Sequence, residues 1–534
     1  MKLTSSYKQS PVEGKYDVII IGSGISGLAA GALLAKEGRK VLILERHYTP
    51  GGFTHMFKRK DYEWDVGIHY IGEVHKPSSV LAQVFKYLSN GQLEWADMGE
   101  VYDKIIFGDE VFDFRSGIEE FKNQLKKYFP DRADQQAIDD YVQLTFDVAK
   151  ASGGFFAERA VPKPISFLFG RFMRRSMNKI ASQTTRQVLE GITKNEKLIG
   201  VLTGQYGDYG LPPAQSSFAM HAMVAKHYFR GGSYPVGGSS RIFDTIAPII
   251  LNAGGAIYTN ADVKEILVTD GKATGVRMAD DVVIEAPMVI SSAGIMNTYN
   301  HLLSPAASQK AGLKQVSGNF IPSSAHLSLY IGLKHTAEEL GIQKPNLWIY
   351  PANYNHDENI ARFLADENEP FPVVYISFPG AKDPDFTNRF PGRTTIEIIT
   401  IAPYERFKEW DGSRWKHRGD DYEAYKEKLS HRLLEYLYKY VPQTQGKVDY
   451  YELSTPLTTK HFINYQNGEI YGIDHTPARF ANRALRPQTP IKGLYLTGQD
   501  IVTAGIGGAL FGGVITASAI LNKNMVKQML SQKL

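Results

Sequence analysis

Residues that could bind a dinucleotide stand close to the N-terminus. Four apolar residues, Val18 to Ile21, precede three glycines at Gly-x-Gly-x-x-Gly spacing, and a second apolar run, 41–44, ends at an acid 18 positions after the last glycine. In such a strand–helix–strand unit the glycines let the backbone approach a pyrophosphate, the helix N-terminus attracts its charge, and the acid accepts hydrogen bonds from a ribose. The pattern assigns these contacts to Gly22, Ser23, Gly24, Ile25, Ser26, Gly27 and Glu45. The alternative interpretation is a tight βα turn that binds no ligand.

Three residues that follow could contact the same ligand. Gly51 and Gly52 provide backbone without side chains, which can pass close to a bound pyrophosphate. Arg46 comes directly after the acid. An ordinary turn and a solvated surface arginine are the alternatives for these positions.

The elements that must position these residues are spread over the chain. Signals for a nucleotide-binding domain occur in residues 15–75, 230–295 and 491–521. In the second segment, a helix from Arg241 to Asn252 precedes a strand and a hairpin. In the third, a strand runs into Gly498-Gln-Asp500, a glycine-rich turn and an apolar helix.

These signals predict an α/β fold, with a discontinuous Rossmann-type domain and an inserted α+β substrate domain. Between the three segments the pattern changes, first to mainly helical periodicity and later to strands mixed with a long helix. We expect residues 1–75, 230–299 and 481–534 to form the discontinuous dinucleotide-binding domain, 76–229 a mainly helical region that contacts substrate and membrane, and 300–480 a mixed α+β substrate domain.

Length and composition narrow the classes of function. A chain of 534 residues is long for one core, so two or more domains are expected. The formal charge of +4 is small for this size and does not suggest a nucleic-acid partner. The absence of cysteine excludes disulfides, iron–sulfur clusters and a thiol nucleophile. No metal site is predicted, and the polar N-terminal stretch favours a cytoplasmic location, with contact at the inner face of a membrane.

Several motifs are spread along almost the whole chain. They include Pro50-Gly-Gly-Phe-Thr-His55, Asp65-Val-Gly-Ile-His-Tyr-Ile-Gly72, Tyr234-Pro-Val-Gly-Gly-Ser-Ser240, Ala381-Lys-Asp-Pro384 and Tyr495-Leu-Thr-Gly-Gln-Asp-Ile501. The architecture is similar to that of the two-dinucleotide-binding-domain flavoproteins, which include amine oxidases and phytoene desaturases. Within that group, these motifs resemble those of the all-trans-retinol 13,14-reductase (retinol saturase) family.

The resemblance implies that the dinucleotide is FAD, and it adds contacts from distant parts of the chain. Val263 resembles the valine whose backbone pairs with adenine in this superfamily. Asp500, preceded by Gly498, resembles the acid that bonds the ribityl chain. The glycine-rich stretch around Ile506 is expected to present backbone N–H groups to the flavin pyrimidine ring.

The resemblance also implies reduction of one C=C bond in a conjugated isoprenoid polyene. Saturation needs a flavin hydride, a proton donor and a dry pocket. The candidate donors are His69, Tyr70 and Tyr234, of which His69 is preferred; a satisfied core residue is the alternative for each. There is no second Gly-x-Gly-x-x-Gly in a strand–helix setting, so the electron donor stays undetermined. The alternative functions are a carotenoid cis–trans isomerase or desaturase, a flavin amine oxidase, and a non-catalytic flavoprotein that binds isoprenoids.

Two segments raise the question of membrane contact. Residues 501–521 carry no charge and contain Gly508-x-x-x-Gly512, but a strand and an acid directly before them favour a helix buried in the dinucleotide domain over a membrane span. Residues 160–189 contain no acid and interleave basic with aromatic and aliphatic residues. This second pattern predicts a helix that lies on a bilayer surface, and the alternative is an amphipathic helix packed on its own domain.

Overall fold

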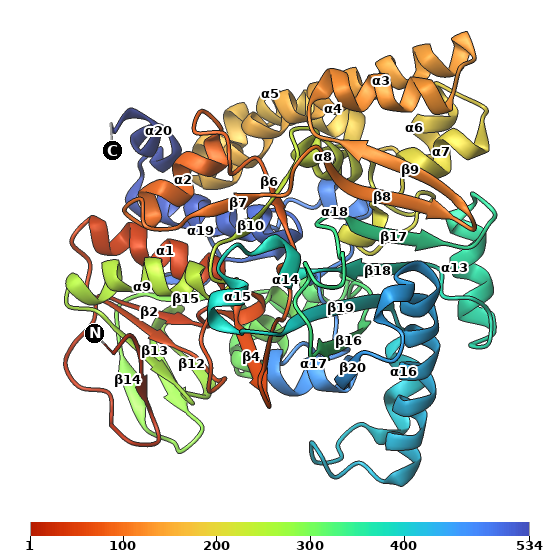
Figure 1. Ribbon diagram of the computed structural model, residues 1–534. Coiled ribbons are helices and arrows are strands. Elements are labelled where there is room, and N and C mark those ends of the chain that lie inside the picture. Colours follow the sequence, from red (N-terminus) through yellow and green to blue (C-terminus); the bar gives the residue numbers. More distant parts are fainter. Residues whose placement is uncertain (1, 533–534) are drawn as a thin grey trace.

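A parallel sheet assembled from distant parts of the chain forms the centre of the fold (Figure 1). The computed structural model describes residues 2–532. The six strands lie in the order β1 (Ser5–Ser6), β11 (Ala256–Thr259), β3 (Val41–Leu44), β2 (Val18–Ile21), β15 (Val289–Ser291) and β21 (Leu494–Leu496), and all neighbours are parallel. The three predicted segments therefore meet in one sheet.

Both faces of this sheet are covered, which explains why its central strands are uninterrupted apolar runs. One face packs against α1 (Ile25–Lys36), α9 (Arg241–Asn252) and α19 (Gly505–Leu521). The other face packs against an antiparallel sheet of β12 (Val263–Thr269), β13 (Lys272–Met278) and β14 (Val283–Glu285). The prediction of an α/β fold with a discontinuous Rossmann-type domain is confirmed.

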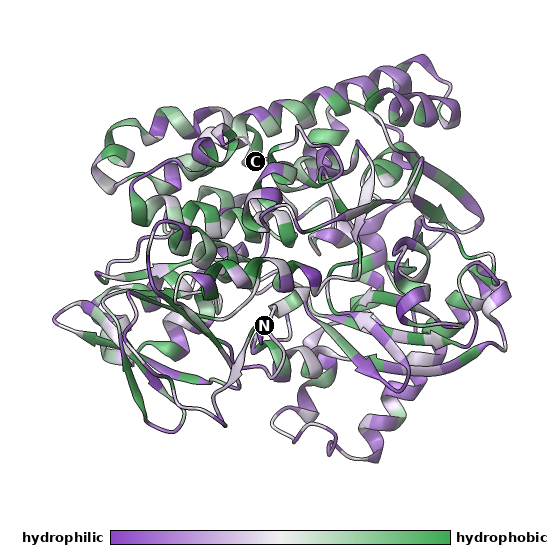
Figure 2. Ribbon diagram, turned by 60° about the vertical axis from the view of Figure 1, so that its left-hand side comes forward, coloured by the Kyte–Doolittle hydropathy of each residue, from purple (hydrophilic) through white to green (hydrophobic). Residues whose placement is uncertain are grey.

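A second, larger sheet forms the inserted part of the molecule. Its seven strands lie in the order β20 (Val448–Ser454), β16 (His326–Leu333), β19 (Thr394–Ile401), β18 (Val374–Ser377), β17 (Asn346–Tyr350), β8 (Val101–Phe107) and β9 (Glu110–Arg115). The long helix α16 (Asp420–Tyr440) packs on it. In Figure 2 hydrophobic residues, in green, are interspersed with hydrophilic residues, in purple, along the helices and strands.

The segment expected to be mainly helical also contains strands. β8 and β9 belong to it, and β8 pairs in parallel with β17, so residues 76–229 and 300–480 share one sheet. A short strand, β7 (Trp95–Asp97), pairs with β10 (Gly232–Pro235). Polar residues interrupt the apolar–polar alternation of these strands, so the pattern did not predict them. Tertiary pairing decides strand formation more than local preference does. The exact domain boundaries stay a prediction.

A layer of helices covers one side of the larger sheet (Figure 1). It contains α3 (Ile118–Tyr128), α4 (Arg132–Ala160), α5 (Lys163–Ala181) and α8 (Phe218–Tyr228). Within residues 2–532, the other α-helices of seven or more residues are α2 (Val80–Leu88), α7 (Glu196–Leu202), α13 (His356–Ala365), α17 (Pro456–Ile463) and α20 (Met525–Ser531).

Glycines let α19 pack closely inside the dinucleotide domain. A Cβ atom on Gly513 would lie 2.4 Å from the carbonyl oxygen of Ser26 in α1, and one on Gly512 would lie 2.6 Å from that of Gly498. The small-residue spacing of this helix therefore serves helix–helix and helix–loop contact. Among residues 2–532, no single helix is long and apolar enough to cross a bilayer; α19 and α20 meet that test only as a pair, with a bend of 104° between them.

Candidate functional site

One large cavity extends from the parallel sheet toward the helical layer and the larger sheet. Its volume is about 1810 Å³, whereas a site for one small ligand has roughly 300–1,000 Å³. It can therefore hold a dinucleotide together with a second molecule. Of the predicted cofactor contacts, those that line it are Gly22, Gly24, Ile25, Ser26, Glu45, Arg46, Gly52, Val263, Gly498 and Ile506.

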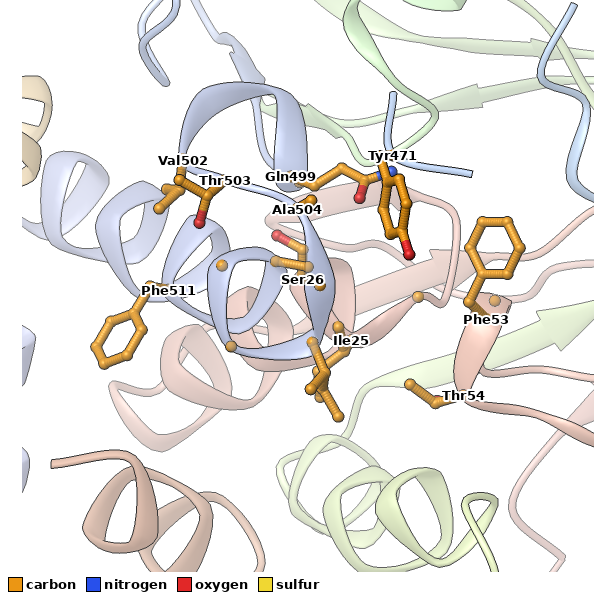
Figure 3. Close-up of a pocket in the computed structure, with 18 of the residues that line it drawn as sticks. Ile25, Ser26, Phe53, Thr54, Tyr471, Gln499, Val502, Thr503, Ala504 and Phe511 are labelled. Carbon is orange, nitrogen blue, oxygen red and sulfur yellow. The ribbon is translucent and has the colours of Figure 1, made fainter. Parts of the chain in front are cut away.

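Two helix N-termini open into this cavity (Figure 3). α1 begins after Gly24 and α19 begins after Ala504, and neither N-cap residue makes a side-chain capping bond; the backbone N of Ala504 itself donates to Nε2 of His475 at 2.8 Å. A Cβ on Gly24 would meet nothing within 4 Å, so backbone N–H groups of α1 are open to a ligand. Free N–H groups and the positive end of a helix dipole bind phosphate. α19 offers the same to a second anionic group, such as a reduced flavin ring.

Glu45 is held in position for a ribose. One carboxylate oxygen accepts hydrogen bonds from the backbone N and the Oγ of Ser23, at 2.8 and 2.7 Å, and the other accepts one from the backbone N of His47 at 2.8 Å. A carboxylate accepts about four hydrogen bonds, so one acceptor position remains for a hydroxyl in the cavity. Ser23 also accepts a hydrogen bond from the backbone N of Gly51 at 2.9 Å, which ties the two glycine turns together. Together with the two helix N-termini, this donor and acceptor set fits FAD.

Asp500 lies behind the cavity surface and braces the loops around it. Its two carboxylate oxygens accept hydrogen bonds from the backbone N atoms of Ile295, at 2.8 Å, and Ile473, at 3.1 Å. The predicted contact with the ribityl chain stays a prediction, and the geometry adds a structural role. Gly27 is also behind the surface, where α1 approaches the sheet. Arg46 lines the cavity and donates a hydrogen bond to the carbonyl oxygen of His461.

His69 lines the cavity and is backed by a buried carboxyl group. Its Nδ1 lies 2.6 Å from Oε2 of Glu397, a fully buried residue in the middle of β19. Burial raises the pKa of Glu397 to about 8 and lowers that of His69 to about 4. At neutral pH both groups are therefore uncharged, and the carboxyl O–H of Glu397 donates a hydrogen bond to Nδ1 of His69. Nε2 of His69 has no hydrogen-bond partner in the part of the chain that the structure describes.

A buried lysine completes the surroundings of this pair. Nζ of Lys382 donates to the carbonyl oxygen of His69 at 2.9 Å, to Oγ of Ser377 at 2.7 Å and to the side-chain oxygen of Asn346. Burial lowers the pKa of Lys382 to about 7. Burial, together with the nearby Glu397, raises the pKa of Asp65 to about 6.

Tyr70 lines the cavity, and its hydroxyl is bonded to acidic side chains. The hydroxyl donates to Oδ2 of Asp103 at 2.9 Å, and the ring stacks on Tyr228 with centroids 4.3 Å apart. Burial raises the pKa of Tyr70 well above its usual value, as do the two neighbouring acids Asp103 and Asp208. The ring of Tyr70 therefore forms an aromatic wall of the cavity, and its raised pKa makes its hydroxyl a weak proton donor.

Tyr234 does not line the cavity. Its hydroxyl donates to Oδ2 of Asp65, which lies one layer behind His69. Its role as a candidate proton donor stays a prediction, and its hydroxyl is bonded to Asp65 rather than facing the cavity. His221, on α8, is a satisfied core histidine, since its two ring nitrogens lie 2.9 and 3.1 Å from the hydroxyls of Tyr141 and Tyr209.

Several residues around the cavity escaped the sequence analysis as site residues. Glu397 is a lone acid in a strand of apolar and hydroxyl residues, which is a detectable signal because a central strand seldom buries a charge without purpose. Lys382 lies in a motif of the resemblance, without an assigned role. The aromatic residues Trp348, Tyr375 and Tyr471, which line the cavity, had no signal apart from their type.

Comparison with known proteins places the chain in a family. Residues 20–88 match the NAD(P)-binding Rossmann-like domain family. An all-trans-retinol 13,14-reductase of Danio rerio is 38% identical over 98% of this chain and 89% of its own length. The chain belongs to the all-trans-retinol 13,14-reductase family. The chain is also 25% identical to the chloroplastic prolycopene isomerase of Arabidopsis thaliana, over 96% of the chain and 84% of the relative.

Solved structures of other proteins share the fold of this chain. The structure of cyclohexylamine oxidase from Brevibacterium oxydans superposes with a TM-score of 0.59 and 16% identity, over 97% of the chain and all of that structure. At this identity the likeness concerns the fold alone. The recognition of the family from its motifs is confirmed.

Proposed function

We propose that this protein is an FAD-dependent oxidoreductase that saturates one C=C bond of a conjugated isoprenoid polyene. The observation that carries the proposal is the continuity of the cavity, which joins the dinucleotide site to an aromatic chamber with His69 in its wall. Bound FAD, once reduced by two electrons, supplies the hydride. A dinucleotide that occupies one end leaves space at the other for a long, apolar second molecule.

The residues of the chain account for positioning and for the proton. α1, Glu45 and the two glycine turns hold the pyrophosphate and the ribose. The aromatic rings of Tyr70, Tyr228 and Trp348 give the polyene apolar walls, and their π faces stabilise positive charge that develops on it. His69 provides a proton at Nε2, the nitrogen that faces away from Glu397.

An anaerobic experiment tests the function. Bound FAD is reduced chemically, retinol or a carotenoid is added, and the spectra of flavin and polyene are followed. Reoxidation of the flavin with a blue-shifted polyene is expected, because saturation shortens the conjugated system. No spectral change with any polyene would defeat the proposal.

Isomerisation is the second candidate, favoured by the similarity to a prolycopene isomerase. The same proton donor could protonate the polyene and then remove a proton after rotation about a bond. In the anaerobic experiment, a shifted polyene with no net oxidation of flavin would indicate this outcome. Consumption of oxygen with amines would indicate an amine oxidase instead.

A bilayer is the proposed source of the substrate. α5 carries a patch of solvent-exposed apolar side chains, here called the α5 patch: Phe167 (81% exposed), Leu168 (70%), Phe169 (61%) and Phe172 (83%). Ile165 of the same helix is also exposed and lines the cavity. Exposed apolar surface of this kind marks an interaction site. A polyene could therefore pass from lipid into the cavity beside α5.

Basic residues on α5 support an anionic bilayer as the partner. Arg171, Arg175 and Lys179 are exposed, whereas Arg174 pairs with the buried Glu158. Each basic residue near such a surface contributes about 1 kcal/mol of binding free energy. Replacing Arg171 and Arg175 by Gln should lower the partition onto anionic liposomes by about thirtyfold, and Phe172→Ser should lower it further.

Sedimentation with liposomes measures this partition. The control is Val283→Ser, which removes an exposed apolar side chain on β14 and should leave partition unchanged. Equal sedimentation of the α5 variants and the control would remove the membrane proposal and leave the redox function untouched.

A further inference from the structure

The buried groups behind His69 form a cluster that the reaction described so far does not use. The cluster contains the acids Asp65, Asp103 and Glu397 and the base Lys382, and the side chains of all four are buried. If every one were ionised, the site would hold three negative charges and one positive charge without water. Isolated charges in such surroundings are costly, and a group in this position keeps its proton instead.

The hydrogen-bond donors decide which acid keeps a proton. Asp103 accepts from Asn346 and Gln205, each at 2.8 Å, and from Tyr70 at 2.9 Å. Three donors stabilise its carboxylate form.

Asp65 also has the donors that an anion needs. It accepts from the backbone N of Ser239 at 3.0 Å and from the hydroxyl of Tyr234.

Glu397 is poorer in donors than either aspartate. Its Oε1 accepts from the backbone N of Asp65 at 2.8 Å, and its Oε2 faces Nδ1 of His69 at 2.6 Å. Lys382 does not bond it, since its ammonium group donates to neutral oxygens. With one backbone donor and a like charge on Asp65 nearby, Glu397 is the acid whose ionised form is least stabilised.

We infer that Glu397 is the proton store of the reaction, a buried carboxylic acid that passes its proton to Nδ1 of His69 while Nε2 protonates the polyene. The inference rests on the proposed function. A π electron pair of the C=C bond forms the new C–H bond with the proton from Nε2. Nδ1 then takes the proton of Glu397, so His69 stays neutral and Glu397 becomes a carboxylate. A bound reduced flavin would supply the hydride for the cationic carbon. Water later returns one proton to Nε2 of His69, and the proton on Nδ1 passes back to Glu397.

The neighbours of Glu397 suit both of its charge states. Before the transfer, the negative charge of Asp65 disfavours the ionised form of Glu397. After it, the ammonium group of Lys382 is the cation that attracts the new carboxylate, as reflected in its lowering effect on the Glu397 pKa. The phenols of Tyr234 and Tyr330 are the other titratable groups that sense its charge. Glu397 is therefore a positioning residue, which acts on the substrate only through His69.

Glu397→Gln tests the role while preserving the contacts. The amide oxygen can still accept from Asp65, and the amide N–H can donate to Nδ1, but no proton can be transferred. We expect KM and FAD content to stay unchanged and kcat for polyene reduction to fall by about 10²-fold or more, the usual contribution of a general acid. The wild-type rate should also fall as the pH rises through about 8, where Glu397 ionises, and this limb should be absent in the variant.

Glu452→Gln is the matched control. Glu452 lies on β20 of the same sheet and pairs with Arg59 in a partly exposed position, so kcat should not change. If Glu397→Gln and Glu452→Gln retain the same kcat and the same pH profile as the wild type, the inference is overturned.

Infrared spectroscopy of the FAD-bound protein gives a readout that needs no turnover. A protonated carboxyl group has a C=O stretching band that a carboxylate lacks. We expect the wild type and Glu452→Gln to lose such a band as the pH rises through about 8, and Glu397→Gln to lack that component. An unchanged band in Glu397→Gln would show that Glu397 is ionised and overturn the inference. If the band behaves as expected and no polyene reoxidises the flavin, the proposed function fails and the proton store remains.

Discussion

Two glycines three residues apart should respond in opposite ways to the same substitution. A Cβ on Gly27 would lie 2.4 Å from the carbonyl oxygen of Gly22 and 3.2 Å from Cγ2 of Ile20, and a backbone oxygen in a tight turn cannot move away. A Cβ on Gly24 would meet nothing within 4 Å and would project where the pyrophosphate should approach. The backbone at Gly24, with φ −58° and ψ 164°, suits alanine.

The magnitudes follow from these contacts. Gly27→Ala forces α1 away from the sheet, and overpacking of this kind costs about 1–3 kcal/mol of unfolding free energy. Gly24→Ala should leave the unfolding free energy of the flavin-free protein unchanged or raise it by about 0.4–1 kcal/mol, because alanine restricts the unfolded chain. Its methyl group should weaken FAD binding by a comparable overpacking cost, which is roughly 5- to 150-fold in Kd.

The assay separates folding from binding. Unfolding of the flavin-free variants is followed by circular dichroism, and FAD affinity is measured by quenching of flavin fluorescence. Gly318→Ala, at the end of a short helix with only ordinary contacts, is the control and should change neither quantity measurably. Wild-type FAD affinity in Gly24→Ala, or equal stability of Gly24→Ala and Gly27→Ala, would refute the assignment of the pyrophosphate to the start of α1.

Other perturbations test the remaining parts of the site. His69→Phe should keep FAD and lose most polyene turnover, measured by product formation, and full activity in this variant would remove His69 as the donor. Glu45→Gln should weaken FAD binding by about 1.5–3 kcal/mol, roughly 10- to 150-fold in Kd, because it loses a charged acceptor; an unchanged Kd in a flavin titration would contradict the ribose contact. Asp500→Asn should lower the unfolding free energy by about 1–3 kcal/mol, since one of two buried backbone N–H groups loses its charged acceptor; chemical denaturation measures this, and an unchanged midpoint and slope would speak against the bracing role.

Local features of the fold could be predicted well from the sequence. The strands 18–21 and 41–44 and the helix 241–252 have the predicted bounds, because a parallel strand buried on both faces reads as an apolar run and a helix on a sheet reads as a 3.6-residue period. The hairpin predicted in the second segment has its turn at Asp270-Gly271. Such a pair predicts a tight turn because both residue types tolerate positive φ angles, which they adopt here. In each case the physical cause lies within a few residues of the pattern.

The sequence by itself determined the dinucleotide unit, the three-part α/β domain and the family, because these depend on local periodicity and on motifs. Only the tertiary structure decided which side chains share the cavity. The contact between His69 and Glu397 joins residues 328 positions apart, and the pairing of β8 with β17 joins Asp103 to Asn346 across 243 positions. Such contacts depend on how the sheets pack, and nothing local encodes them. For the same reason the sequence motifs did not show that Tyr234 lies behind Asp65. They also did not show that Glu397, in a distant strand, lies next to His69.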